Sequence, residues 1–305
     1  EAPVNAATSF LWLMLMTGIG VCGIAMPIAS VVLGVAFHAS ASVLAWKVVG
    51  GKSGLLAGIL VAVDGFGAWA SVGMETWMFI SLLLAVVLAY DRDRSVLAAG
   101  LCGLLILARP DGVLLAILIF ADWVAIRGRA PWRESLAIGA SVIPWSILCL
   151  IIFAGGAIPT GMEAKQVQAH VGIIGAYTWT SFEYFLLKVP YVLLGLSLLT
   201  AWFIRRRALY VLLIFAVASH AAYSIARIAA FPWYYAPMMV CLWIVAASLL
   251  EALRGHLIQT VFLVCLIMCS AVLFFRYADA DSIYTGQSGE QERSVALDLR
   301  DDTHV

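Results

Sequence analysis

The sequence predicts an all-α integral membrane protein, a polytopic bundle of about ten transmembrane helices with one further interfacial helix on the outer face. Three observations predict it: 64% of the 305 residues are hydrophobic, only 12% are charged, and long apolar segments recur along the chain. Soluble domains are about 45–50% apolar and about 25% charged. The net charge of zero also argues against a nucleic-acid partner.

The first apolar stretch differs from those that follow it. Residues 7–20 are too few to cross a bilayer. Gly18 and Gly20 lie at the end of this stretch, and Gly23 follows it. We therefore expect an interfacial or re-entrant helix within residues 1–25, which would be the remainder of a first outer loop. The transmembrane bundle is expected to follow over residues 26–275. Its predicted crossings are 26–46, 54–69, 73–90, 95–108, 112–127, 134–154, 186–203, 208–227, 232–252 and 256–275.

The basic residues predict how this bundle is oriented. Short cytoplasmic loops carry an excess of Lys and Arg, and the basic clusters of this chain fall in every second loop. The clusters are Lys47/Lys52, Arg92/Arg94, Arg127/Arg129/Arg133, Arg205–Arg207 and Arg254. This pattern places the loop 155–185 on the outer side, together with residues 276–305, the expected start of a C-terminal outer region.

Ionisable side chains in or beside lipid are costly, so each of them indicates a functional site. Asp122 is the main one on the predicted inner side. The others lie on the predicted outer side: Asp64, Glu75, Arg109, Asp111, Lys165, Glu183, Lys188, His220 and Arg227. This asymmetry predicts an active site at the outer membrane surface.

Several of these residues also have a purely structural explanation. Arg109 and Asp111 flank a proline and could pair only with each other, and Glu75 could stabilise a helix N-terminus. Arg227 and Lys188 could extend to lipid head groups. A further group could be structural as well: His220 as a core histidine, Asp64 as a helix-end residue, and Trp233, Tyr234 and Tyr235 as an interfacial aromatic belt.

Taken together, the outer residues suit a phosphate-bearing amphiphile with a ring-shaped polar head. Arg binds phosphate through bidentate hydrogen bonds and Lys binds it as a point charge, so Arg109, Lys165 and Arg227 are the predicted phosphate-binding residues. Carboxylates and aromatic faces would hold a sugar. The predicted sugar-binding or orienting residues are Glu75, Asp111, Trp233, Tyr234 and Tyr235.

Four stretches resemble motifs of a known superfamily. Residues 72–76 resemble an SGMET motif, and residues 108–112 resemble ARP(D/E)G. Residues 158–165 resemble LPNT…AK, and residues 227–237 resemble R…FPWYY.P. Their order and spacing resemble the GT-C membrane glycosyltransferases, and most nearly the polyprenyl-phosphate-sugar-dependent families that are mannosyltransferase-like or arabinofuranosyltransferase-like. The resemblance covers about the whole chain.

The resemblance implies an extracytoplasmic active site, in a protein of a bacterial inner or plasma membrane. There an inverting reaction would move a sugar from a polyprenyl-phosphate donor to a glycan, lipid or protein acceptor of the cell envelope. The superfamily's general base is an Asp of the first outer loop, which would lie before Glu1, so no catalytic base is assigned in this chain. We expect the chain to be truncated at both ends and, without that base, inactive alone. No metal ligands are predicted, although a divalent metal ion is compatible with the chemistry.

Two other classes of protein stay open. A secondary transporter or lipid-carrier flippase would also be polytopic, but transporters often place their charges near the bilayer midplane and contain inverted repeats. A structural subunit of an envelope-assembly complex would use the embedded charges for assembly alone. The outer location of the charges favours the enzyme.

Overall fold

The computed structural model of the chain describes residues 9–64, 73–128, 130–152, 177–178, 189–203, 206–227, 231–253 and 258–272. All regular structure within these residues is helical, which confirms the all-α prediction for them. The helices are α1 (Phe10–Val21), α2 (Met26–Val49), α3 (Gly51–Ala62), α5 (Thr76–Asp91), α6 (Ser95–Ala108), α7 (Gly112–Arg127), α8 (Trp132–Ile152), α11 (Val189–Phe203), α12 (Arg207–Ala226), η1 (Pro232–Tyr234), α13 (Ala236–Ser248), η2 (Leu249–Glu251) and a final helix over Ile258–Val272.

Each apolar segment predicted to cross the membrane contains a helix, but the helices differ in length. Only α2, α8 and α12, among the described residues, are long and apolar enough to cross a membrane by length and composition. The 16 residues of α5 extend about 24 Å at 1.5 Å per residue. A bilayer core is about 30 Å thick, so α5 alone does not reach across it.

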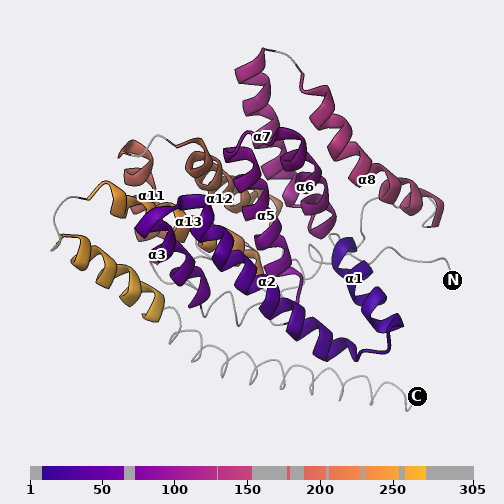
Figure 1. Cartoon of the computed structure of the whole chain (residues 1–305), viewed down its shortest axis with the longest axis horizontal. Helices are drawn as coiled ribbons and strands as arrows, with labels where there is room; N and C mark the ends of the chain where they lie inside the picture. The colour runs from indigo at the N-terminus through magenta and orange to yellow at the C-terminus, as the bar shows by residue number, and fades with distance from the viewer. Residues whose placement is uncertain are drawn as a thin grey trace, which may run out of the picture.

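Helix α13 lies in the interior of the bundle (Figure 1). Every residue of α13 is buried, and the helix packs against α3, α5, α11 and α12. A helix that is apolar on all sides is suited either to a protein core or to lipid. Its contacts with α3, α5, α11 and α12 place α13 in the core.

The outer helices present large apolar side chains to their surroundings. On α2 these include Val31, Val32 and Val35, and α8, which packs on α6, exposes Ile147 and Ile151. A soluble monomer rarely exposes contiguous apolar faces of this kind. These faces are compatible with a lipid environment.

The short helix α1 matches the helix expected near the start of the chain. It has 12 residues, about 18 Å of helix, which is too short to cross a bilayer. It packs against α2 and α6, and the Phe10 ring stacks on Trp145 of α8 with 3.4 Å between centroids.

The helix connections divide the bundle into two ends. The α2–α3, α5–α6 and α7–α8 turns, at Gly50, Asp93 and Gly128, form one end, which we call the hairpin end. Arg206, just before α12, links the ends of α2 and α5 at this end of the bundle. Its guanidinium donates to the Asp91 carboxylate at 2.5 and 3.3 Å and to the Val49 carbonyl at 2.7 Å.

The opposite end contains the start of α5, the α6–α7 turn, the end of α12 and η1. We call it the Arg109 end. Most of the described ionisable residues that the sequence places on the outer side lie here. The predicted exception on the other side, Asp122, accepts a hydrogen bond of 2.6 Å from the Tyr90 hydroxyl, so that carboxylate has a structural partner.

Glycines permit the close approach of α3 to α2. A Cβ atom at Gly54 would lie 2.5 Å from the Trp46 carbonyl oxygen, and one at Gly58 would lie 2.9 Å from that of Ser42. Small residues allow helix backbones to pack this closely in membrane proteins.

We predict that Gly54→Ala lowers the free energy of unfolding by about 1–3 kcal/mol, because the added methyl group overpacks a backbone contact. Gly100→Ala in α6 is the matched control, since nothing lies within 4 Å of its Cβ position. It should be neutral or stabilise the protein by about 0.5–1 kcal/mol. Unfolding of both variants in lipid nanodiscs measures the difference, and equal shifts would contradict the packing argument.

Candidate functional site

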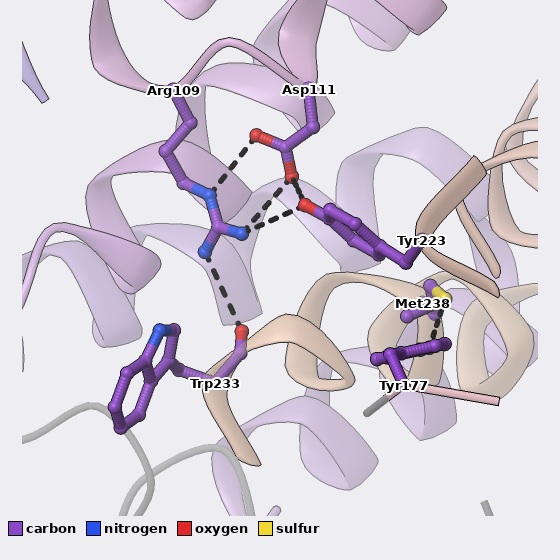
Figure 2. Close-up of polar contacts among 6 residues, drawn as sticks. All are labelled: Arg109, Asp111, Tyr177, Tyr223, Trp233 and Met238. Atoms are coloured by element: carbon purple, nitrogen blue, oxygen red, sulfur yellow. Dashed lines mark hydrogen bonds and ion pairs between the residues drawn. The ribbon is translucent and has the colours of Figure 1, made fainter. Parts of the chain in front are cut away.

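The turn between α6 and α7 follows directly from its sequence. Pro110 disfavours the helical conformation in the residue before it, and Arg109 accordingly has an extended backbone, with φ −156° and ψ 141°, that ends α6. Gly112 opens α7, where a Cβ atom would lie 2.8 Å from the Leu105 backbone. The Arg-Pro-Asp-Gly stretch thus forms a tight turn that brings the side chains of Arg109 and Asp111 together (Figure 2).

Arg109 forms a bidentate ion pair with Asp111. Its Nε donates to Oδ1 at 3.1 Å, and Nη2 lies 3.1 Å from Oδ2. Arg109 is buried and Asp111 is nearly so, with side chains 4% and 10% exposed. The pairing that the sequence left open is therefore present.

Two further segments converge on this ion pair (Figure 2). The Tyr223 hydroxyl of α12 accepts a hydrogen bond of 3.1 Å from Arg109 Nη2 and donates one of 2.5 Å to Asp111 Oδ2. Arg109 Nη1 donates to the Trp233 carbonyl of η1 at 3.5 Å. The two charges and the hydroxyl thus form a compact, internally hydrogen-bonded unit, which we call the Arg109 network.

Aromatic rings enclose the guanidinium. It lies 5.1 Å from the Phe79 ring centroid and 5.2 Å from that of Tyr234, which are distances of cation–π contact. Burial disfavours the charged guanidinium, but its neighbours, Asp111 foremost, outweigh this and raise the pKa of Arg109 above its ordinary value. Arg109 is therefore a permanent cation.

Glu75 lies beside this network at the start of α5. Its carboxylate is half-buried, acts electrostatically on Arg109 and Tyr234, and makes no side-chain capping hydrogen bond to α5. Gly73 precedes it with φ 73°, and a Cβ atom there would lie 3.1 Å from the Ser30 hydroxyl oxygen. Glycine is favoured at this position because it fits both the left-handed backbone and the contact.

The three aromatic residues predicted to touch a sugar lie at different depths. Tyr235 is fully buried and stacks on Tyr177, with 4.9 Å between ring centroids, and Tyr234 is 6% exposed. Trp233 is half-buried and stacks on Phe231 at 4.3 Å. The Trp233–Phe231 pair is therefore the more accessible aromatic surface at this end.

One of the interior aromatic residues, Tyr177, is a hydrogen-bond partner of His220. The Tyr177 hydroxyl shares a hydrogen bond of 2.9 Å with His220 Nδ1 and contacts the Met238 sulfur at 3.8 Å. His220 is buried, as expected of a core histidine. Asp64 is also buried and directly follows the end of α3, as expected of a helix-end residue.

Arg227 differs from Arg109 because its side chain is exposed. It ends α12 in the left-handed conformation, with φ 46° and ψ 41°. Asp93 is the other non-glycine residue with positive φ in the described chain, and Asp tolerates this conformation more readily than Arg. Lys165, Lys188 and Glu183 lie outside the described residues.

Sequence reasoning missed three members of this site: Phe79, Tyr177 and Tyr223. Tyr223 had a usable signal, because it lies four residues before Arg227 and residues at this spacing share one face of a helix. Phe79 and Tyr177 had none, since their roles depend on contacts with distant segments.

We predict that Asp111→Ala destabilises the protein by about 3–5 kcal/mol, because it leaves the buried Arg109 charge without its carboxylate. The double variant Arg109→Met/Asp111→Ala should be less destabilised than Asp111→Ala, since it leaves no buried charge without its partner, and the single variant Arg109→Met completes the set. A double-mutant cycle on unfolding free energies measures the coupling. Additive effects of the two single changes would contradict a direct ion pair.

The Arg109 end offers charged side chains that could bind a polar ligand, next to an aromatic surface. The half-buried Glu75, the exposed Arg227 and the Trp233 ring lie around a network whose own donors and acceptors are largely used internally. Within the described residues, no group of three His, Cys, Asp or Glu side chains is arranged to hold a metal ion. Comparison of the chain with protein-family models, curated proteins and solved structures finds no match in any of the three.

Proposed function

We propose that this chain is the membrane part of a glycosyltransferase that moves a sugar from a polyprenyl-phosphate donor to an extracytoplasmic acceptor. One observation supports this proposal most. Three stretches that resemble glycosyltransferase motifs, residues 72–76, 108–112 and 227–237, are distant in sequence and each acts on Arg109: Glu75 through its charge, Asp111 as the ion-pair partner, and the third through the Trp233 carbonyl and the Tyr234 ring. Motif residues that served only to start or end their own helices would have no reason to converge.

The proposed topology has ten crossings with the Arg109 end outside. It is supported by the described basic clusters, which lie at the hairpin end, on the turns after α2, α5 and α7 and at the start of α12. Basic residues favour the cytoplasmic side of short loops. A polyprenyl-phosphate donor in the outer leaflet would then approach the site sideways from the lipid.

The three predicted phosphate-binding cations have different roles in this proposal. Arg227 is exposed and directly contacts the donor phosphate, with Lys165 as a second cation. Arg109 directs its hydrogen-bond donors at Asp111, Tyr223 and the Trp233 carbonyl. It therefore contributes the local positive charge and holds the surrounding segments in place.

The proposed reaction is an inverting displacement. An acceptor hydroxyl attacks the anomeric carbon, the bond from that carbon to the phosphate oxygen breaks, and the cations stabilise the phosphate as it leaves. Glu75 would hold sugar hydroxyls, and the Trp233–Phe231 pair would cover one face of the ring. The base that takes the acceptor proton is not assigned.

The left-handed backbone of Arg227 supports its functional role and gives a clean test. Glycine is the usual residue at such a helix end, so keeping an arginine there costs about 1 kcal/mol. Strained conformations of this kind concentrate at functional sites. Arg227→Gly removes the cation and relieves the backbone strain, so a loss of binding with an unchanged melting temperature is due to the missing cation.

We predict that Arg227→Gly weakens the binding of polyprenyl phosphate about tenfold or more, the effect of losing a charge-assisted hydrogen bond. Binding is measured with the full chain in nanodiscs that contain graded amounts of polyprenyl phosphate. This readout does not depend on the unassigned base. Arg227→Lys should retain most of the binding, because it keeps the charge.

Asp93→Gly is the matched control for this experiment. It relieves the same left-handed backbone at the hairpin end and removes a carboxylate instead of a cation, so binding should equal or exceed that of the wild type. Wild-type binding by Arg227→Gly would refute the phosphate assignment. If the chain instead moves polyprenyl phosphate between leaflets without transferring sugar, the lipid-carrier transporter is the better assignment.

A further inference from the structure

The exposed tryptophans of the described chain all lie at the hairpin end. They are Trp46 near the end of α2, Trp132 at the start of α8 and Trp202 near the end of α11, with exposures of 48%, 62% and 78%. The described tryptophans elsewhere are buried or half-buried. Because Trp side chains concentrate at the level of lipid head groups, these three rings mark a membrane interface at this end.

The carboxylates of the hairpin end are mostly occupied by partners inside the protein. Asp91 pairs with Arg206, Glu134 accepts from Arg127 at 2.6 Å, and Asp122 accepts from Tyr90. Two exposed carboxylates, Asp93 and Glu251, complete the described acids at this end. They are outnumbered by exposed cations outside these pairs: Lys47, Lys52, Arg92, Arg94, Arg133 and Arg207.

We propose that the hairpin end binds anionic phospholipid head groups, with the Arg92–Arg94 turn and the Trp132–Arg133 pair as the principal contacts. This inference does not rest on the proposed glycosyltransferase function, because it concerns the opposite end of the bundle. The excess of exposed cations supplies charge complementarity to lipid phosphate, as polybasic segments do at anionic leaflets.

The apolar residues next to these cations identify the partner as a lipid. Val96 and Leu97 follow Arg94 on α6 and are each 51% exposed, and Leu136 follows Arg133 on α8 and is 63% exposed. A partner must therefore meet cations and apolar side chains within one or two helical turns. A phospholipid does so, since its phosphate lies directly above its acyl chains.

The Trp132–Arg133 pair is arranged for this contact. The Arg133 guanidinium lies over the Trp132 ring, 5.3 Å from its centroid, and both side chains are exposed. The ring fixes the depth of the pair at the interface, and the guanidinium, a planar fork of donors, matches phosphate geometry. By contrast, Arg127 is occupied by Glu134 and by the Trp123 ring.

The test measures which lipids surround the full chain. The protein is placed in nanodiscs of phosphatidylcholine with about 25% phosphatidylglycerol, a composition that mimics an anionic leaflet. Native mass spectrometry of the released protein then gives the ratio of the two lipids that remain bound. We expect the wild-type chain to retain phosphatidylglycerol at about three times its bulk proportion or more, because each Lys or Arg near an anionic surface contributes about 1 kcal/mol.

Three variants make the result decisive. Arg92→Gln/Arg94→Gln/Arg133→Gln should lose the enrichment, and the corresponding triple Lys variant, which keeps the charges but not the planar donors, should keep most of it. Asp93→Asn should increase it, because it removes a repelling carboxylate from the same turn. Melting in phosphatidylcholine alone should be the same for all variants and the wild type, since these side chains are exposed.

Inorganic phosphate distinguishes a lipid site from a simple anion site. Added phosphate should leave the phosphatidylglycerol enrichment unchanged, because it lacks acyl chains to occupy the apolar flank. Two outcomes would overturn the proposal: equal enrichment in the wild type and the Gln variant, or full competition by inorganic phosphate. Neither outcome bears on polyprenyl-phosphate binding at the Arg109 end, which is measured separately.

Discussion

The site depends on one buried guanidinium. Arg109 is placed beside apolar rings, where an uncompensated charge would cost several kcal/mol. Asp111, Tyr223 and the Trp233 carbonyl supply the compensation. Because these partners belong to the α6–α7 turn, α12 and η1, satisfying one charge requires three distant segments to meet. Breaking any of these contacts would leave a buried polar group without its hydrogen-bond partner.

At the Arg109 end, the residues that hold the helices together therefore differ from those that are accessible to a ligand. The ion pair and Tyr223 satisfy one another and are largely closed to ligands, whereas Glu75, Arg227 and Trp233 at the periphery retain access. The hairpin end is organised differently. It joins its helices through the Arg206–Asp91 pair and leaves other cations exposed at its surface. One end of the bundle thus buries its charge, and the other presents it.

The sequence predicted those parts of the structure that depend on neighbouring residues along the chain. The apolar segments became helices, and Pro110 ended α6 where an Arg-Pro-Asp-Gly turn requires it. Contacts between distant segments could not be predicted in this way. Asp111 and Tyr223 are 112 residues apart, and only the packing of α12 brings them together.

The burial of individual aromatic side chains was equally hard to predict from the sequence. Consecutive aromatics at 233–235 read alike in sequence, yet the 3₁₀ turn η1 leaves Trp233 half-buried and puts Tyr235 in the core. Neither periodicity nor composition distinguishes these two positions.

The burial of α13 on every side has a consequence for how the chain is assembled. A helix with no lipid-facing surface gains its stability from neighbours, and α2, α3, α5 and α12 all precede it in the chain. During synthesis these helices would emerge before α13, with their inner faces in contact with one another or with lipid. The core of the bundle would therefore be completed only after α13 has emerged, and any delay in packing α13 would prolong the stage at which those inner faces are uncovered.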